Sequence, residues 1–215
     1  MAKKYQSIET KIHPMTWIIM GLILVSLLTL FFAVQPTEKD LLYTSYETAA
    51  QGDSSFGKKL PEDNKIHLLK SLDNEWFNEG LLSLSDRDDQ LTIVYFGNSS
   101  VTGSSLALAN AYAYLYGAVK ADVDVSSLFD ALGDSKVKFY HYEATADQMN
   151  SISERLNEKF EDLELNAPTI PYIVAFFNGE VLEHGSLTQS NVPQYLKYTF
   201  YKNIFEHESL QSFLD

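Results

Sequence analysis

The sequence predicts an α/β domain with a mixed central sheet flanked by helices, preceded by one N-terminal transmembrane helix. Three observations carry this prediction. About twenty uncharged, mostly apolar residues lie near the N-terminus, apolar β-rich runs alternate with helical patterns after residue 65, and Asn178-Gly179 separates the last two β-rich runs. Parallel strands joined by helical crossovers place helices on both faces of a sheet.

The apolar segment 14–35 contains no charged residue. A helix of about 20 apolar residues crosses about 30 Å of hydrocarbon. A cleavable signal peptide has a shorter apolar core that ends in small residues at alternate positions, and the ending FFAVQ lacks that pattern. We therefore expect an uncleaved, single-pass anchor in the cell membrane. Lysines in the tail 1–13 place the N-terminus in the cytoplasm and the C-terminal domain outside it.

The composition excludes several classes of function. The chain has no cysteine, which excludes disulfides, thiol nucleophiles, iron–sulfur clusters and cysteine zinc sites. Its net charge is −13, and residues 1–34 carry three lysines and one glutamate, so the remainder carries −15 and is expected to be repelled by nucleic acid and by anionic lipid surfaces. We expect no cofactor, no metal and no nucleic-acid partner, whereas the membrane and a protein or peptide partner fit the chain. The sequence leaves the oligomeric state open.

Residues 36–64 show no sustained hydrophobic period and contain several Gly, Pro and Asp residues, which is typical of a stalk or linker. One helical turn or more fits around residues 41–50. A folded domain is expected at 65–207, with a C-terminal tail at 208–215. Its expected strands are 65–69, 91–96, 137–143, 172–177 and 180–184, and its expected helices are 72–84, 104–120, 125–132, 145 to about 160, and 189–207.

The junction between the apolar strand 91–96 and the helix that begins at Ser104 resembles the active-site region of the thioredoxin family. The family has a Cys-x-x-Cys motif at this helix N-terminus, and Val101, Thr102, Gly103 and Ser104 occupy its four positions. Ile170-Pro171, followed by an apolar strand and an Asn-Gly hairpin, resembles the family's cis-proline, whereas Pro168 does not have the expected spacing. The resemblance covers residues 65–207 and implies a thioredoxin-like fold with an insertion at about 121–134.

The departures from the family restrict what the resemblance implies about activity. Thiol–disulfide exchange requires a thiolate, which Val101 and Ser104 cannot supply, so we expect no such activity and no other enzymatic activity. In the family, the residue before the cis-proline binds extended peptides through its main chain. Ile170 holds that place beside Thr102, which implies a peptide-binding groove. An equally weighted interpretation is that Pro171 serves the fold alone.

We therefore expect a non-catalytic peptide-binding or accessory module in the export, folding or assembly of envelope proteins. The alternative is a structural subunit of a membrane complex that docks through its terminal helix. That helix carries more aromatic residues than one sheet-facing stripe needs. The candidate interface residues are Tyr195, Tyr198, Tyr201 and Phe205. The insertion or the stalk could equally cover them.

Two other kinds of site have weaker support in the sequence. A hydrolase would use Ser104 as nucleophile, but the chain has no Gly-x-Ser-x-Gly elbow and no histidine near it in sequence. His67, His141 and His184 fall on three expected strands without the short spacing that metal ligands usually have.

Overall fold

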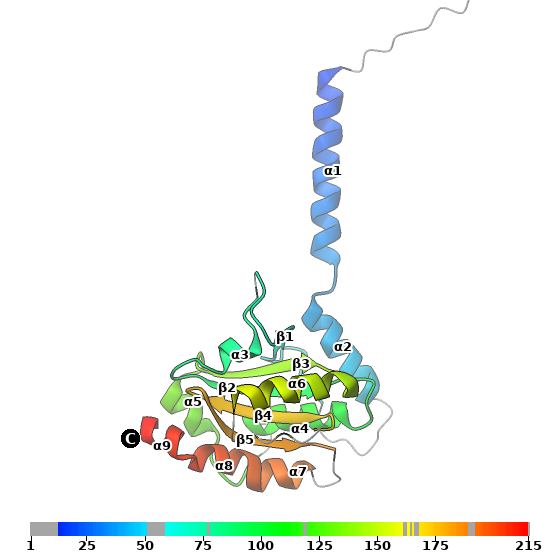
Figure 1. Ribbon diagram of the computed structural model, residues 1–215. Coiled ribbons are helices and arrows are strands. Elements are labelled where there is room, and N and C mark those ends of the chain that lie inside the picture. Colours follow the sequence, from blue (N-terminus) through cyan, green and yellow to red (C-terminus); the bar gives the residue numbers. More distant parts are fainter. Residues whose placement is uncertain are drawn as a thin grey trace, which may run out of the picture. The chain divides into compact units, whose positions relative to one another are not determined.

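The computed structural model of the chain describes residues 13–50, 59–76, 78–117, 120–160, 163, 165, 168–188 and 192–214 (Figure 1). The chain divides into two units, Met1–Thr37 and Glu38–Asp215, and each is described by itself.

The first unit contains one helix, α1 (Pro14–Val34), within its described residues. Proline at the first helical position and a hydrogen bond of 3.2 Å from the Met15 N–H to His13 Nδ1 start the helix. At about 1.5 Å per residue, its 21 residues extend about 31 Å. All its side chains are exposed and none is charged. This helix is long and apolar enough to cross a membrane.

A five-stranded mixed sheet organises the second unit. Its strands are β1 (His67–Leu69), β2 (Leu91–Gly97), β3 (Val137–Glu143), β4 (Tyr172–Phe177) and β5 (Glu180–Ser186). They lie in the order β1-β3-β2-β4-β5; β1, β3 and β2 are parallel, while β4 and β5 are antiparallel to their neighbours. Asn178 and Gly179 both have positive φ angles, as a tight two-residue hairpin requires. The predicted mixed sheet is confirmed.

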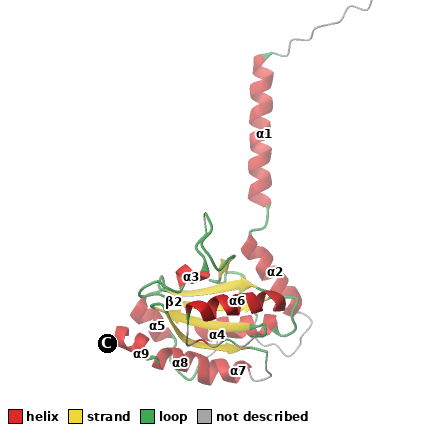
Figure 2. Cartoon of the chain, in the orientation of Figure 1, coloured by secondary structure: helices red, strands yellow, loops and turns green. Residues whose placement is uncertain are grey.

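Helices cover both faces of this sheet (Figure 2). One face packs against α3 (Leu81–Leu84) and α6 (Ala146–Lys159), which begins with a capping box made by Thr145 and Gln148. The other face packs against α4 (Ser104–Leu115), α5 (Ser126–Leu132) and the terminal helices. Helix α4 is shorter than the expected 104–120, because Tyr116 caps it and Gly117 takes a positive φ of 75°.

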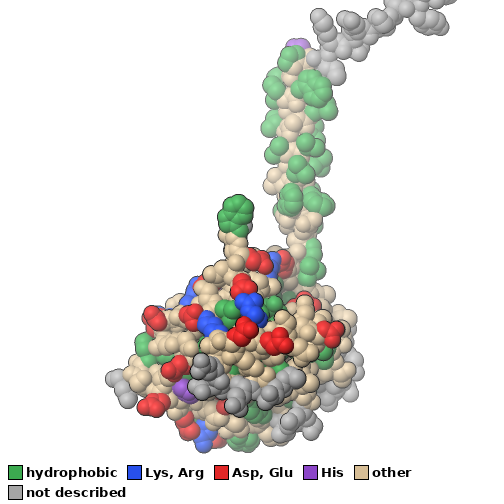
Figure 3. Space-filling model, viewed as in Figure 1, with side chains coloured by type: hydrophobic (Ala, Val, Ile, Leu, Met, Phe, Trp, Pro, Cys, Tyr) green, Lys and Arg blue, Asp and Glu red, His purple; other side chains and the backbone are tan. Residues whose placement is uncertain are grey.

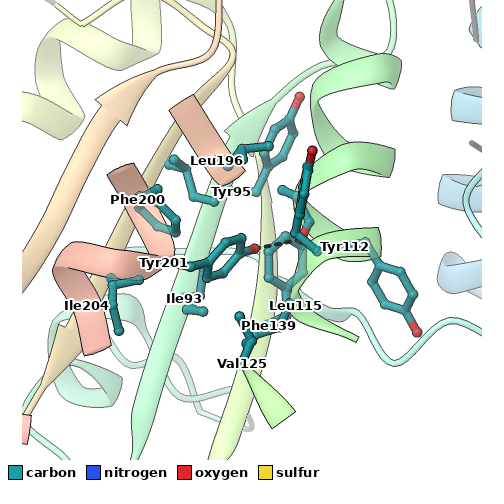
Figure 4. Packing of buried hydrophobic residues seen from close by; sticks show 14 of the residues in the cluster. Ile93, Tyr95, Tyr112, Leu115, Val125, Phe139, Leu196, Phe200, Tyr201 and Ile204 are labelled. Carbon is teal, nitrogen blue, oxygen red and sulfur yellow. Dashed lines mark hydrogen bonds between the residues drawn. The ribbon is translucent and has the colours of Figure 1, made fainter. Parts of the chain in front are cut away.

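The terminal segment is helical without a break from Val192 to Glu206, with one π-helical turn inside it, and a further short helix follows His207. Its parts are α7 (Val192–Tyr195), a π-helical turn η2 (Leu196–Phe200), α8 (Tyr201–Glu206) and α9 (Glu208–Leu214). The expected stripe of Val192, Leu196, Phe200 and Ile204 is buried, as Figure 4 shows for its last three members beside residues of β2, β3 and α4. Helix α9 lies within the expected tail, where Leu210 is fully buried.

The segment expected to be a stalk contains a helix that belongs to the domain. Helix α2 (Glu38–Ala50) buries Leu42 and Tyr46 in the same hydrophobic cluster as β2, β3 and α4. These residues are four positions apart and therefore lie on one face of the helix. The second unit accordingly begins at Glu38, and not at residue 65 as the stalk interpretation implies. Residues 51–58 of the expected stalk lie outside the described residues.

The expected helix 72–84 is also different: only α3 (Leu81–Leu84) is helical. The residues before it form a loop, because the Asn74 side chain accepts a hydrogen bond of 2.8 Å from the Gly80 N–H and Glu75 pairs with Asn78 through two main-chain hydrogen bonds. Asn, Asp and Gly residues favour such turns over helix. The Trp76 side chain, expected on the buried side of a helix, is 94% exposed.

Replacing aromatic residues of the terminal helices tests which of them belong to the core. Tyr201→Ala removes a fully buried ring whose hydroxyl donates a hydrogen bond of 2.6 Å to the Ala111 carbonyl. We expect a loss of about 3–5 kcal/mol in the free energy of unfolding, measured by chemical denaturation. The matched variant Tyr198→Ala removes a ring that is 48% exposed and should change stability by less than about 0.5 kcal/mol. Equal losses would contradict this packing.

Candidate functional site

The loop from β2 into α4 carries the four residues at the Cys-x-x-Cys positions. Asn98 shapes the loop, because its side-chain oxygen accepts hydrogen bonds from the N–H and the hydroxyl of Ser100, at 2.9 and 2.6 Å. Gly103 precedes α4 with a φ of 83°, a conformation that favours glycine. The side chains differ in exposure: Val101 is half-buried, Thr102 and Gly103 are exposed, and Ser104 is fully buried.

Ser104 lies in a buried polar network that joins four elements, α2, β2, β3 and α4. The Tyr95 hydroxyl on β2 donates to the Ser104 carbonyl at 2.6 Å and lies 2.8 Å from Ser104 Oγ. On the other side, the Tyr46 hydroxyl of α2 lies 3.5 Å from Ser104 Oγ and 2.8 Å from His141 Nε2. We call Tyr46, Tyr95, Ser104 and His141 the buried network.

Burial sets the ionisation of this network. It lowers the pKa of His141 to about 3, because the charged imidazolium loses its hydration inside the domain. Burial also raises the pKa values of the Tyr46 and Tyr95 hydroxyls, so both stay protonated. Neutral groups that satisfy each other's hydrogen bonds are stable in a core. The network therefore fastens α2 to β3 and to the start of α4.

The same geometry opposes the hydrolase interpretation. The structure does bring a histidine to Ser104, which sequence spacing does not reveal. However, Tyr46 stands between Ser104 and His141, and the Ser104 side chain has no exposed surface. A nucleophile must reach its substrate, and a general base must bond to the nucleophile. Ser104 meets neither requirement.

Ile170 and Pro171 lie at the same end of the sheet as this loop. Phe96, near the end of β2, pairs with Tyr172 at the start of β4, so the residues before Tyr172 run beside those that follow Phe96. Val101 and Ile170 pack in one hydrophobic cluster. The Ile170–Pro171 peptide bond is cis. We call Val101, Thr102, Gly103, Ile170 and Pro171 the motif surface.

The strand order, the helix that starts directly after β2 and the cis-proline before β4 together decide the fold. The fold is thioredoxin-like. The chain has no cysteine, so the residues at the Cys-x-x-Cys positions cannot carry out thiol–disulfide exchange.

Solved structures similar to this chain include several thioredoxins. The thioredoxin of Malassezia sympodialis, a member of a pan-allergen family, is 14% identical over 67% of this chain and 91% of its own, with a TM-score of 0.38. Spinach chloroplast thioredoxin f is 11% identical over 71% and 96%, with a TM-score of 0.35. Trypanosoma brucei brucei thioredoxin is 15% identical over 62% and 88%, with a TM-score of 0.32. No family model and no curated protein matches the sequence.

The main chain of Ile170 is a part of the motif surface that lacks a hydrogen-bond partner among the described residues. Its N–H and C=O form no hydrogen bond with the residues that the structure describes, whereas the Pro171 carbonyl next to it accepts one of 2.8 Å from the Leu187 N–H. Ile170 itself is 6% exposed. Buried main-chain groups are nearly always hydrogen-bonded. An N–H and a C=O without such partners among the described residues are therefore candidates for pairing with an extended segment of another chain.

A cavity of about 470 Å³ lies between α2, β1 and the end of β3. Leu42, Leu68, Tyr46 and His141 contribute to its wall, so the buried network forms one of its sides. An ion pair of 2.6 Å between Lys70 and Glu38 belongs to the same lining. Sequence reasoning misses this cavity because α2 falls in the expected stalk. The spacing of Leu42 and Tyr46 is the signal that could have revealed it.

The four candidate interface residues of the terminal helices have different environments. Tyr201 is fully buried, and the Tyr195 hydroxyl donates to the Glu183 carboxylate at 3.1 Å and to the His184 carbonyl at 3.0 Å. Phe205 packs against the core, and Tyr198 is the exposed member of the set. Tyr201 is therefore not available to a partner, which corrects the expectation at that residue.

The histidines are engaged separately. His184 Nδ1 lies 2.6 Å from the Tyr172 hydroxyl, His67 packs against the Tyr140 ring, and His141 belongs to the buried network. Within the part of the chain that the structure describes, no three His, Asp or Glu side chains gather as a metal site requires.

The buried neutral His141 predicts a specific loss of stability in acid. Its pKa is lower in the folded state than the ordinary 6.5, so below about pH 6.5 the unfolded chain takes up a proton that the folded chain refuses. The free energy of unfolding should fall by about 1.4 kcal/mol per pH unit from this group, down to about pH 3. Denaturation of the full chain at about pH 7 and about pH 5 should show a loss of about 2 kcal/mol from His141 that His141→Gln removes, whereas the smaller losses from His67 and His184, whose pKa values burial also lowers, remain.

The control for this measurement replaces the partly exposed His207. His207→Gln should keep the acid sensitivity of the original chain. If His141→Gln keeps it as well, His141 is not the buried neutral group described here.

Proposed function

We propose that this chain is a membrane-anchored, non-catalytic protein-binding module whose thioredoxin-like domain captures extended segments of other proteins at the motif surface. Helix α1 would cross the cell membrane, with the lysine-containing tail in the cytoplasm and the domain outside. A role in the export, folding or assembly of envelope proteins fits such a location.

The observation that carries the proposal is that the Ile170 main chain has no hydrogen-bond partner among the described residues, at the same end of the sheet as the exposed Thr102 and Gly103. An extended peptide can pair with one N–H and one C=O as an added strand does, and this pairing uses no side-chain chemistry. Loss of both cysteines therefore leaves the means of recognition in place. Thr102 and Gly103 are small, so a peptide backbone can approach them closely.

The alternative function, a structural subunit docked through the terminal helices, has less support. Three of its four aromatic candidates pack within the domain itself. Tyr198 is the exposed member of the four, so a docking partner would contact the domain at this position.

A peptide library tests main-chain recognition directly. The full chain in lipid nanodiscs is screened with extended peptides of random sequence, and the bound peptides are then resynthesised with single N-methyl groups. Methylation at the residue that pairs with Ile170 should weaken binding about tenfold, because it removes one hydrogen bond worth about 1–1.5 kcal/mol. Methylation one position away along the peptide, where the amide points to the other side, should have little effect.

Variants of the protein provide the matching controls. Ile170→Asp should abolish peptide capture, and Tyr198→Asp should leave it unchanged. A photo-crosslinker at Thr102 should label the peptide, while one at Glu158, on the exposed side of α6, should not. Peptide capture that tolerates Ile170→Asp and every N-methyl group, or labelling from Glu158 instead of Thr102, would refute the proposed surface.

A further inference from the structure

A narrow protrusion on the second unit ends in a tryptophan. Residues 71–80 leave the sheet after β1 and return at α3. Glu75 and Asn78 form an antiparallel pair, with main-chain hydrogen bonds of 2.8 and 3.1 Å, and Trp76 lies in the turn between them. The indole is 94% exposed, the highest value among the large hydrophobic side chains of the described residues. The space-filling view shows a stem of the domain that ends in hydrophobic atoms (Figure 3).

The base of this protrusion is built to hold it in place. Main-chain bonds join Leu81 to Ser71 at 3.2 Å and Leu82 to Leu72 at 2.9 Å. A Cβ atom at Gly80 would lie 2.3 Å from the Asp73 main chain, so only glycine lets the two arms approach this closely. A rigid base means that the exposed tryptophan is presented in a fixed direction.

The charges around the base largely cancel. Arg155 donates two hydrogen bonds, of 2.6 and 3.1 Å, to the Asp73 carboxylate, and Arg87 forms an ion pair with Glu79. Lys70, at the end of the arm that follows β1, pairs with Glu38 at 2.6 Å. Glu75, next to Trp76, has no ion-pair partner among the described residues, but the other charges named here are paired, so this part of the surface repels a lipid surface less strongly than the net charge of the chain suggests.

Chain connectivity sets an upper limit on the distance between this surface and a bilayer that α1 crosses. Only residues 35–37 separate α1 from α2, and the four steps from Val34 to Glu38 span at most about 14 Å. The headgroup layer is itself several ångströms thick on each side of about 30 Å of hydrocarbon. Glu38 is ion-paired to Lys70, and the six residues from Lys70 to Trp76 reach at most about 20 Å.

We propose that Trp76 inserts into the headgroup interface of the membrane crossed by α1 and forms a second contact that orients the domain. This inference rests on the membrane anchoring proposed above. A tryptophan ring has a large apolar area and a single N–H donor, and such side chains collect at the boundary between hydrocarbon and water. A bilayer receives one protruding ring without a shaped pocket, whereas a protein partner would need one.

Fluorescence of the chain's two tryptophans, Trp17 and Trp76, can test this contact. The variant Trp17→Phe leaves Trp76 as the only reporter, and Trp76→Phe leaves Trp17 in the span. Each full chain is reconstituted into phosphatidylcholine vesicles with spin-labelled headgroups or with bromine atoms deep in the acyl chains. Trp76 should be quenched by the headgroup label, emit at shorter wavelength than an indole in water, and be quenched several-fold less by aqueous iodide than free tryptophan.

The two reporters separate failure of this inference from failure of the anchor. Quenching of Trp17 by deep bromine atoms, together with a Trp76 that is open to iodide and insensitive to the headgroup label, would overturn the inference and leave the anchor standing. If neither tryptophan is quenched by lipid, the anchor fails, and the inference fails with it.

A third reporter controls for collapse of the domain onto the vesicle. Tyr198→Trp in a chain that lacks both natural tryptophans places an indole at a position that is 48% exposed on the terminal helices. It should be accessible to iodide and unaffected by the headgroup label. Headgroup quenching at this position as strong as at Trp76 would contradict insertion of one specific loop.

Discussion

The contact of α2 with the start of α4 is the interaction on which the rest of the structure depends. Tyr46 reaches from α2 to His141 on β3 and to Ser104, in the position of the family's second cysteine. Because these groups are buried and neutral, each satisfies the other, and removing one would leave an unpaired polar group in the core. The bond makes α2 part of the domain. The domain consequently starts three residues after α1, without a stalk.

The same contact shows what the residues at the Cys-x-x-Cys positions do in a chain without cysteine. The serine at the start of α4 is a hydrogen-bonding partner of Tyr95 and Tyr46, and the valine at the first motif position packs against the hydrophobic cluster that contains Ile170. Both positions now contribute to stability instead of reactivity. At this end of the sheet Thr102 and Gly103 are exposed, and the Ile170 main chain has no hydrogen-bond partner among the described residues. Under the proposed function, these main-chain groups would pair with an extended segment.

Sequence patterns predicted the sheet well, since alternating or continuous apolar runs mark β2, β3 and β4 and the Asn178-Gly179 pair fixes the hairpin. They failed where tertiary contacts decide the outcome. Leu72, Trp76 and Leu81 have helical spacing, but the Asn74 cap on Gly80 and the Glu75–Asn78 pair impose a turn. A helical turn around residues 41–50 was expected, but its packing against the domain was not, because two buried residues, Leu42 and Tyr46, are too few to give a hydrophobic period. The approach of His141 to Ser104, 37 positions away, has no signal in sequence spacing.

Hydrogen exchange along α2 tests the central claim most directly, namely that this helix is a fixed part of the domain. The full chain is placed in lipid nanodiscs, and amide exchange is compared between α2 and α4, alongside Tyr46→Phe. Docking predicts that amides of residues 42–48 exchange nearly as slowly as those of α4 and that Tyr46→Phe speeds them selectively. Exchange of these amides at the rate of an unfolded linker, unchanged by Tyr46→Phe, would contradict it.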